Sequence, residues 1–133
     1  MRLVTTIDDI DTRSPNGMSR GSLGAMYADR KRVAGIVQLV YLRTLAMLGR
    51  RKVVGVPRVT LTRLSSSPKP MDRDNLIAAL KPVVDGLARG LGLVDDYELQ
   101  ERMTWARERC ARGYKGVRIE VELEGGQSWD GPM

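Results

Sequence analysis

Acidic residues gather at the two ends of one apolar segment, between residues 71 and 100. Asp72 and Asp74 open this segment, and the adjacent pair Asp95 and Asp96 follows it. Carboxylates that lie close together repel each other and raise one another's pKa unless a cation lies between them. Mg²⁺ is a hard cation that takes oxygen ligands from a few carboxylates and keeps waters for substrate phosphates. The pattern therefore suggests a divalent-metal site.

A helix from Asn75 to about Leu91 is expected to position these carboxylates. Its leucine, isoleucine and valine residues recur at three- and four-residue spacings, which indicates one apolar face. Asp74 is the expected N-cap, because its side chain can accept hydrogen bonds from the first free amides. Lys81 and Asp85 follow Asp74 by seven and eleven positions, so the three lie on almost the same face. We expect the chain after the helix to bring the second aspartate pair back towards the helix start.

Each part of this pattern also has a purely structural explanation. Two aspartates at a helix start commonly cap the helix and interact favourably with its dipole. An aspartate pair after a glycine turn is commonly a solvated loop. Their combination in one unit, with a lysine on the matching face, favours a functional site. An EF-hand loop is excluded, because Leu76 takes the next ligand position and Ile77 the position of the required glycine.

The same segment resembles the RusA-like family of Holliday-junction resolvases, which are Mg²⁺-dependent endonucleases associated with phages and prophages. The resemblance covers about thirty residues. It rests on a D-x-D-N-L sequence, a helix with a lysine and a D-G-L ending, a short apolar stretch and a D-D pair. The matching residues are Asp72, Asp74, Asn75, Leu76, Lys81, Asp85, Gly86, Leu87, Asp95 and Asp96.

The resemblance implies roles for several of these residues. The family's three catalytic aspartates correspond to Asp72, Asp74 and Asp96, which would hold one or two Mg²⁺ ions, or Mn²⁺ in their place, with Asp95 as a neighbouring ligand. Lys81 would stabilise charge on the phosphate or position the water. The best-known members carry their lysine closer to the D-N-L, where this chain has Ala78, so Lys81 is its substitute here.

The composition excludes several classes of enzyme. The chain has 133 residues and no histidine, which removes Ser-His-Asp and Cys-His catalysis and histidine-liganded zinc. A single cysteine, Cys110, excludes an internal disulfide framework and suits a reducing compartment. No apolar run is long enough to span a bilayer and no secretory signal opens the chain, so we expect no membrane contact and a cytoplasmic location. The resemblance implies that the cell is bacterial or phage-infected.

The net charge of +6 suggests a polyanionic partner, with solubilising surface charge as the alternative explanation. Arg30, Lys31 and Arg32 lie near the start of a helix expected from about Met26 to Met47, where the helix dipole is unfavourable for cations. They are therefore the better candidates for DNA phosphate contacts. Lys69, just before the first aspartates, could also steer a phosphate or be simply solvated.

The remaining segments predict an α+β fold. Strands are expected at residues 2–7, 53–64, 101–111 and 116–124, with a hairpin-like connection at 112–116. The order β-α-β-α-β-β then gives a mixed sheet with two main helices on one face. This order is compatible with the RusA-like fold that the resemblance implies. We expect a single domain at residues 1–124 and a flexible C-terminal tail at 125–133.

These observations predict a metal-dependent endonuclease that hydrolyses DNA phosphodiester bonds, with four-way junctions as the substrate implied by the resemblance. Cutting two opposed strands requires two active sites, so a homodimer is expected. One alternative is a basic nucleic-acid-binding protein whose aspartates only cap and brace a helix. Another is a metal nuclease with a different substrate, such as flaps, nicks or RNA.

Overall fold

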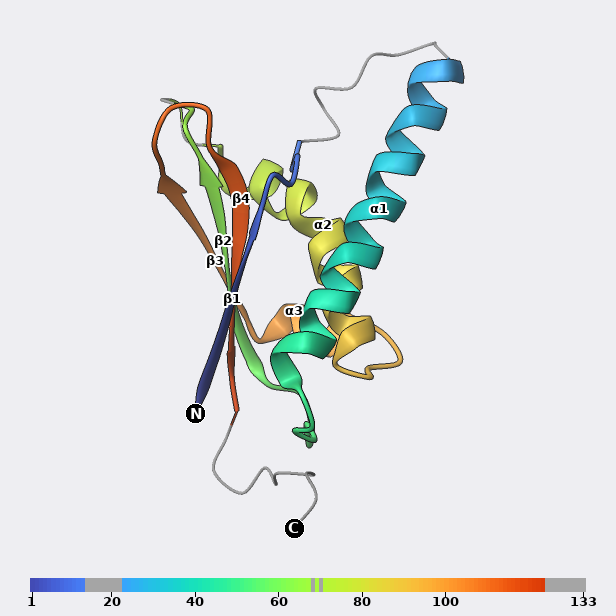
Figure 1. Ribbon diagram of the computed structural model, residues 1–133, viewed down its shortest axis with the longest axis vertical. Helices are drawn as coiled ribbons and strands as arrows, with labels where there is room; N and C mark the ends of the chain where they lie inside the picture. Colours follow the sequence, from blue (N-terminus) through green and yellow to red (C-terminus); the bar gives the residue numbers. More distant parts are fainter. Residues whose placement is uncertain (14–22, 68, 70, 124–133) are drawn as a thin grey trace.

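A four-stranded mixed sheet carries two long helices on one of its faces (Figure 1). The computed structural model describes residues 1–13, 23–67, 69 and 71–123, so Glu124 and the tail expected at 125–133 lie outside the described residues. The elements are β1 (Arg2–Asp8), α1 (Leu23–Leu48), β2 (Arg58–Ser65), α2 (Arg73–Gly90), α3 (Tyr97–Glu101), β3 (Met103–Arg109) and β4 (Lys115–Glu122).

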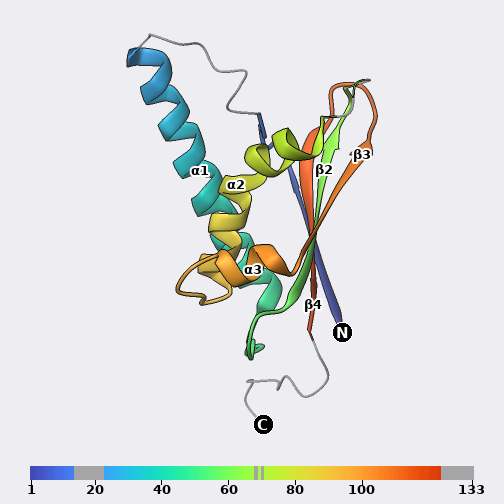
Figure 2. The ribbon, with the colours of Figure 1, turned by 180° about the vertical axis from the view of Figure 1, so that it is seen from behind.

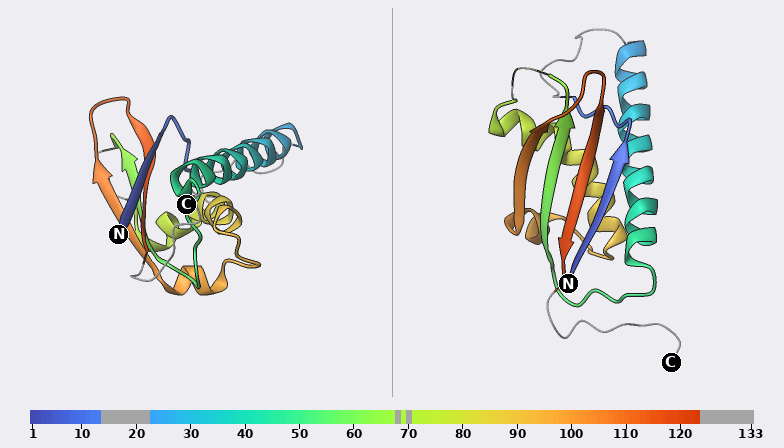
Figure 3. Two further views of the ribbon diagram at one scale, coloured as in Figure 1. Left: turned by 60° about the horizontal axis from the view of Figure 1, so that its bottom comes forward. Right: turned by 60° about the vertical axis from the view of Figure 1, so that its left-hand side comes forward.

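The sheet has the strand order β1-β4-β2-β3. Strand β4 pairs antiparallel with both β1 and β2, whereas β2 and β3 run parallel. Val117, Ile119 and Val121 of β4 are fully buried, which suits a strand with neighbours on both sides and helices over one face. The predicted α+β class, with two helices on one face of a mixed sheet, is confirmed (Figure 3).

The predicted hairpin at residues 112–116 is wrong. Strands β3 and β4 are consecutive in the sequence, but β2 lies between them and pairs with both. The inward side of β4 is wholly apolar and fits the centre of the sheet, whereas β3 exposes Arg107 and Arg109 and forms an edge.

Other boundaries also differ from the predictions. Helix α1 starts at Leu23 rather than near Met26, and β2 starts only at Arg58 because Gly55, with φ of 75°, turns the preceding chain. The five-residue helix α3 was not predicted, since a single helical turn has no detectable apolar periodicity. Among the described residues, none of the helices has the length and apolarity needed to cross a membrane.

Helices α1 and α2 touch almost backbone to backbone at two glycines. A Cβ atom added at Gly86 would lie 2.6 Å from the carbonyl oxygen of Val37 and 2.8 Å from the Cβ of Val40. A Cβ atom added at Gly90 would lie 2.6 Å from the Cβ of Thr44. Both Val40 and Thr44 are fully buried. The D-G-L sequence therefore has a packing role, because its glycine admits the neighbouring helix.

We predict that Gly86→Ala destabilises the protein by about 1–3 kcal/mol, because the added methyl group overpacks the helix crossing. This loss should appear although alanine favours a helix over glycine by about 1 kcal/mol. Urea unfolding measures the difference. The matched control is Gly35→Ala in α1, where an added Cβ meets nothing within 4 Å and stability should stay equal or rise. Equal effects of the two substitutions would contradict the proposed contact.

Candidate functional site

The carboxylate that caps α2 is Asp72, and the prediction that Asp74 is the N-cap was wrong. Asp72 has extended backbone angles, and its Oδ1 accepts a hydrogen bond from the backbone N–H of Asn75 at 2.8 Å. Its Oδ2 accepts a second hydrogen bond from Nδ2 of Asn75 at 3.0 Å. The third residue after the cap supplies the amide, as in other capped helices, and that spacing selects Asp72.

Asp74 lies in the first turn of α2 and is exposed. Its negative charge is favourable there, because the free amides make this end of the helix positive. Within the described part of the chain, no side chain forms a hydrogen bond or ion pair with its carboxylate. Asp74 is therefore available to a cation from solution.

Lys81 gathers two further carboxylates. Its Nζ donates a hydrogen bond to Oδ2 of Asp96 and lies 3.1 Å from Oδ1 of Asp85. Asp85 is one turn further along α2, whereas Asp96 comes from the turn that connects α2 to α3. Asp96 occupies the N-cap position of α3 without making a side-chain capping bond, which leaves its carboxylate to Lys81.

The lysine supplies a positive charge that favours the ionised form of Asp96. Its hydrogen bond to Asp96 lowers the pKa of that carboxyl group, although partial burial acts in the opposite direction. Burial alone would lower the pKa of Lys81, but its hydrogen bonds to Asp96 and Asp85 outweigh that effect and raise it. In this cluster one ammonium group therefore contacts the side-chain oxygens of two aspartates.

Asp95 does not join this cluster. Its Oδ1 accepts a hydrogen bond from the backbone N–H of Tyr97 at 3.1 Å, and the residue is exposed. This hydrogen bond stabilises the turn that leads into α3.

The predicted metal ligands are not gathered in one place. Asp96 meets α2 at Lys81 and Asp85, which at 1.5 Å per residue lie about 13 and 20 Å along the helix from Asp72. Among the described residues, no three acidic, histidine or cysteine side chains form a group that could hold a metal ion. The candidate carboxylates therefore fit Mg²⁺ by the chemistry of their oxygens but not by their arrangement here.

Of the predicted DNA-binding residues in α1, one is already paired and two are exposed. Arg32 pairs with Asp29 at 2.8 Å and donates to the carbonyl oxygen of Asp11 at 2.6 Å, so it ties α1 to the chain after β1. Arg30 and Lys31 are exposed and lie in the third turn of α1, further from the helix start than expected.

The exposed Lys69 lines a cavity of about 250 Å³ that sequence reasoning missed. Arginines of β2 and β3 line the same cavity. The period-two alternation of the two strands was visible in the sequence, but their parallel pairing was not. The full lining is Arg63, Ser65, Ser67, Lys69, Met71, Arg107, Glu108 and Arg109.

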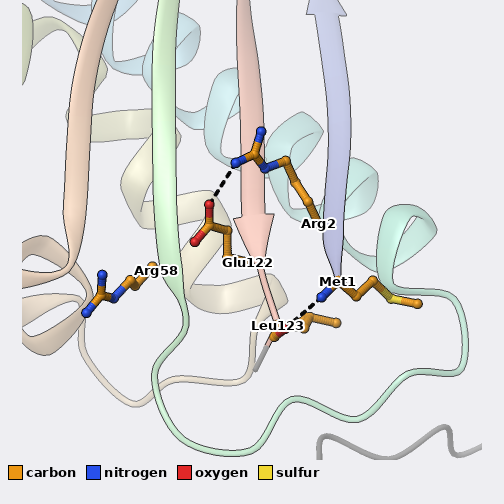
Figure 4. Close-up of a pocket in the computed structure, with 5 residues that line it drawn as sticks. All are labelled: Met1, Arg2, Arg58, Glu122 and Leu123. Atoms are coloured by element: carbon orange, nitrogen blue, oxygen red, sulfur yellow. Dashed lines mark hydrogen bonds and ion pairs between the residues drawn. The ribbon is translucent and has the colours of Figure 1, made fainter. Parts of the chain in front are cut away.

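A second cavity, of about 540 Å³, lies where β1 starts and β4 ends (Figure 4). The guanidinium group of Arg2 bonds to the carboxylate of Glu122 at 3.0 Å, and the Met1 amino group donates to the carbonyl oxygen of Leu123 at 3.1 Å. Arg58 also lines this cavity. Because its acid is already paired with an arginine, this cavity offers no candidate for acid–base or metal chemistry.

No model of a known protein family matches the chain, and no curated protein matches it.

We predict that Lys81→Met lowers the free energy of unfolding at pH 7 by about 1 kcal/mol, because Asp85 and Asp96 lose their shared cation in a partly solvated site. The folded-state pKa of Asp96 is below its ordinary value of 3.8, so its stabilising contribution is complete above that value. The contribution disappears as the pH falls through the lowered pKa. The difference between the two proteins should therefore shrink towards pH 3.

Urea unfolding at pH 7 and pH 3 measures this difference, with the exposed Lys52→Met as the matched control. A loss of equal size at both pH values would contradict an electrostatic role for Lys81.

Proposed function

We propose that the protein is a metal-dependent endonuclease that hydrolyses DNA phosphodiester bonds. The observation that carries this proposal is the contact of Asp96 with Lys81 and Asp85, on the stripe of α2 that begins at the exposed Asp74. A carboxylate from a separate segment thus contacts the helix that carries Asp74, in a protein with a net charge of +6. Oxygen ligands for a hard cation, on a protein that attracts polyanions, suit phosphodiester hydrolysis.

The proposed metal ligands are Asp72, Asp74 and Asp96, with Asp95 beside them, and the metal is Mg²⁺ or Mn²⁺. Since these groups are separated in the structure, the proposal requires Asp96 to leave Lys81 and approach the start of α2. Lys81 would then still be paired with Asp85, but its ammonium group would be released from Asp96 and could stabilise negative charge on a phosphate.

The four-way junction, the RusA-like fold and the bacterial or phage-infected cell enter this proposal from the sequence resemblance alone. The proposed location is the cytoplasm of that cell. The mixed sheet with two helices on one face is compatible with that fold. Branch geometry cannot be inferred from these residues, so flaps, nicks and RNA remain alternative substrates.

A non-catalytic nucleic-acid-binding protein is the second candidate. It is favoured by the structural roles of two aspartates, because Asp72 caps α2 and Asp96 is paired with Lys81. In that case nucleic-acid binding would not depend on divalent metal.

We predict that the wild-type protein cuts a labelled four-way junction by paired, symmetric nicks in Mg²⁺, and a matched linear duplex much less. EDTA should abolish cleavage. Asp74→Asn should lower the rate by about 100-fold or more, because removal of a metal ligand takes away several kcal/mol of transition-state stabilisation. Gel separation of the cleavage products measures all of these outcomes.

The control for this experiment is Glu98→Gln, which removes an exposed carboxylate in the first turn of α3 and should leave the rate unchanged. Junction binding without cleavage in Mg²⁺ or Mn²⁺, equal in wild type and Asp74→Asn, would rule out the nuclease and establish the binding protein.

The proposed homodimer needs a contact face, and the outer face of α1 is suited to pair with a second copy. Leu39, Leu42 and Leu45 are 40 to 50% exposed on this helix. Between residues 34 and 46 the one exposed charged residue is Arg43, and its guanidinium donates to the carbonyl oxygen of Thr6. Two copies of a protein with a charge of +6 would thus meet here with little repulsion.

We predict that Leu42→Glu converts a homodimer into a monomer, because two glutamates would be buried opposite each other. Light scattering coupled to size-exclusion chromatography should show the mass fall to that of one 14.8 kDa chain. Val94→Glu, at a fully exposed apolar residue elsewhere, should not change the mass. A monomeric wild-type protein at micromolar concentration would contradict the dimer.

A further inference from the structure

The basic cavity beside the start of α2 is built from two adjacent parallel strands. Arg63 of β2 lies opposite Arg107 of β3, and Ser65 lies opposite Arg109. Residues two apart on a strand share a face, so these four side chains project from one side of the sheet. Two steps earlier on that face, Leu61 is fully buried in the core. The core face of the sheet therefore continues beyond the apolar core as a row of arginines.

The start of α2 borders this row of arginines. Figure 3 shows the first turn of α2 beside the ends of β2 and β3. Met71 lines the basic cavity, and Arg73 and Leu76 line a neighbouring cavity of about 380 Å³ together with Trp105 and Arg107. Arg107 belongs to both cavities. We call this surface, from Arg63 and Arg109 through Arg107 to Arg73, the arginine track.

The arginine track carries positive charge that the protein itself leaves largely uncompensated. In the part of the chain that the structure describes, no carboxylate pairs with Arg63, Arg107 or Arg109. Among the described residues, the one acidic residue that lines either cavity is Glu108, and its carboxylate is already paired with Arg118. An anion from outside would therefore meet several guanidinium groups and no free carboxylate.

Arg63 is the most constrained of these cations. Its Nε and Nη2 donate to the carbonyl and hydroxyl oxygens of Thr12 at 3.1 to 3.2 Å, which fixes the direction of the guanidinium plane. The group is half-buried, and this burial lowers its pKa because it destabilises the charged form, while the negative charge of Asp11 acts in the opposite direction. A bound anion would relieve this cost.

The size and the hydroxyl groups of the basic cavity suit a phosphate. Its volume of about 250 Å³ corresponds to roughly eight water molecules, which is enough for one phosphate group and its hydration. The hydroxyl oxygen of Ser65 accepts a hydrogen bond from the backbone N–H of Ser67 at 3.1 Å, so its own proton remains to be donated. Guanidinium forks and hydroxyls are the usual contacts to phosphate oxygens.

We propose that the arginine track binds the phosphodiester backbone of a nucleic-acid strand, with consecutive phosphates at Arg63–Arg109 and at Arg107–Arg73. Trp105, which is half-buried and lines the second of these cavities, gives an apolar wall for a sugar or the edge of a base. A strand bound on this track would also pass Asp72 at the start of α2, and this part of the inference rests on the proposed function. The proposal that the track binds a strand does not depend on the proposed function.

The test measures binding of a fluorescent DNA duplex and a four-way junction by anisotropy, in EDTA and at several salt concentrations. Arg107→Ala and Arg109→Ala should each weaken binding by about tenfold, as expected for one charged hydrogen-bonded contact. The slope of log K against log salt should become shallower by about 0.9 for each phosphate that the variant no longer neutralises. Ser67→Asp, which places a carboxylate in the cavity, should weaken binding further.

Arg50→Ala is the matched control, because it removes the same charge at an exposed residue after α1. It should leave the affinity within about twofold of wild type and the slope unchanged. Thermal melting checks that each variant is folded, and Arg107 and Arg109 are both exposed, so their replacement should not disturb the core.

The outcomes separate this proposal from the proposed function. If Arg107→Ala, Arg109→Ala and Ser67→Asp behave like Arg50→Ala, the arginine track is not the binding surface, whatever cleavage shows. If wild type binds through the track but cuts no DNA with Mg²⁺ or Mn²⁺, the track stands and the nuclease does not. A protein that binds no DNA, but is stabilised by inorganic phosphate through Arg107, would overturn the nucleic-acid ligand in favour of a free phosphate compound.

Discussion

The close crossing of α1 and α2 decides which side of α2 can meet solvent. Gly86 and Gly90 let the backbone of α1 approach within contact distance, while Val83, Val84 and Leu87 are fully buried. Helix α2 is therefore enclosed over most of its circumference (Figure 2). Only a narrow stripe remains for polar residues, and that stripe carries Asp74, Lys81 and Asp85. The position of the acidic candidates follows from how tightly the other sides are packed.

Among the described residues, some charged side chains form ion pairs and some arginines have no acidic partner. Asp85 and Asp96 share Lys81 as their cation, Arg32 is neutralised by Asp29, and Glu108 is neutralised by Arg118. Within the described part of the chain, the arginines of β2 and β3 that line the basic cavity form no ion pair with a carboxylate. A protein that concentrates unpaired cations at one end of its sheet attracts polyanions there. The stripe of Asp74, Lys81 and Asp85 and the arginine track thus lie on different sides of α2.

Much of the fold could be predicted from residue patterns, and the errors in that prediction have physical causes. The 3.6-residue period of α2 and the alternation in β4 were sufficient to predict both elements, because each buries one continuous apolar face. The cap of α2 was misplaced by two residues, since Asp72 and Asp74 are both good caps and the choice depends on where the first turn closes. The predicted hairpin was wrong because strand pairing depends on which strand lies between two apolar neighbours in the sheet. Local sequence does not contain that information.

The sequence by itself determined the helical face that holds Asp74, Lys81 and Asp85, because residues seven and eleven positions apart on a helix must share a side. It also determined the positive charge of the protein and the absence of histidine chemistry. Only the tertiary structure decided that Asp96 meets the helix at Lys81 rather than beside Asp72, and that Arg63 lies opposite Arg107. Such contacts join segments far apart in the chain, and their geometry is set by the packing of every element between them.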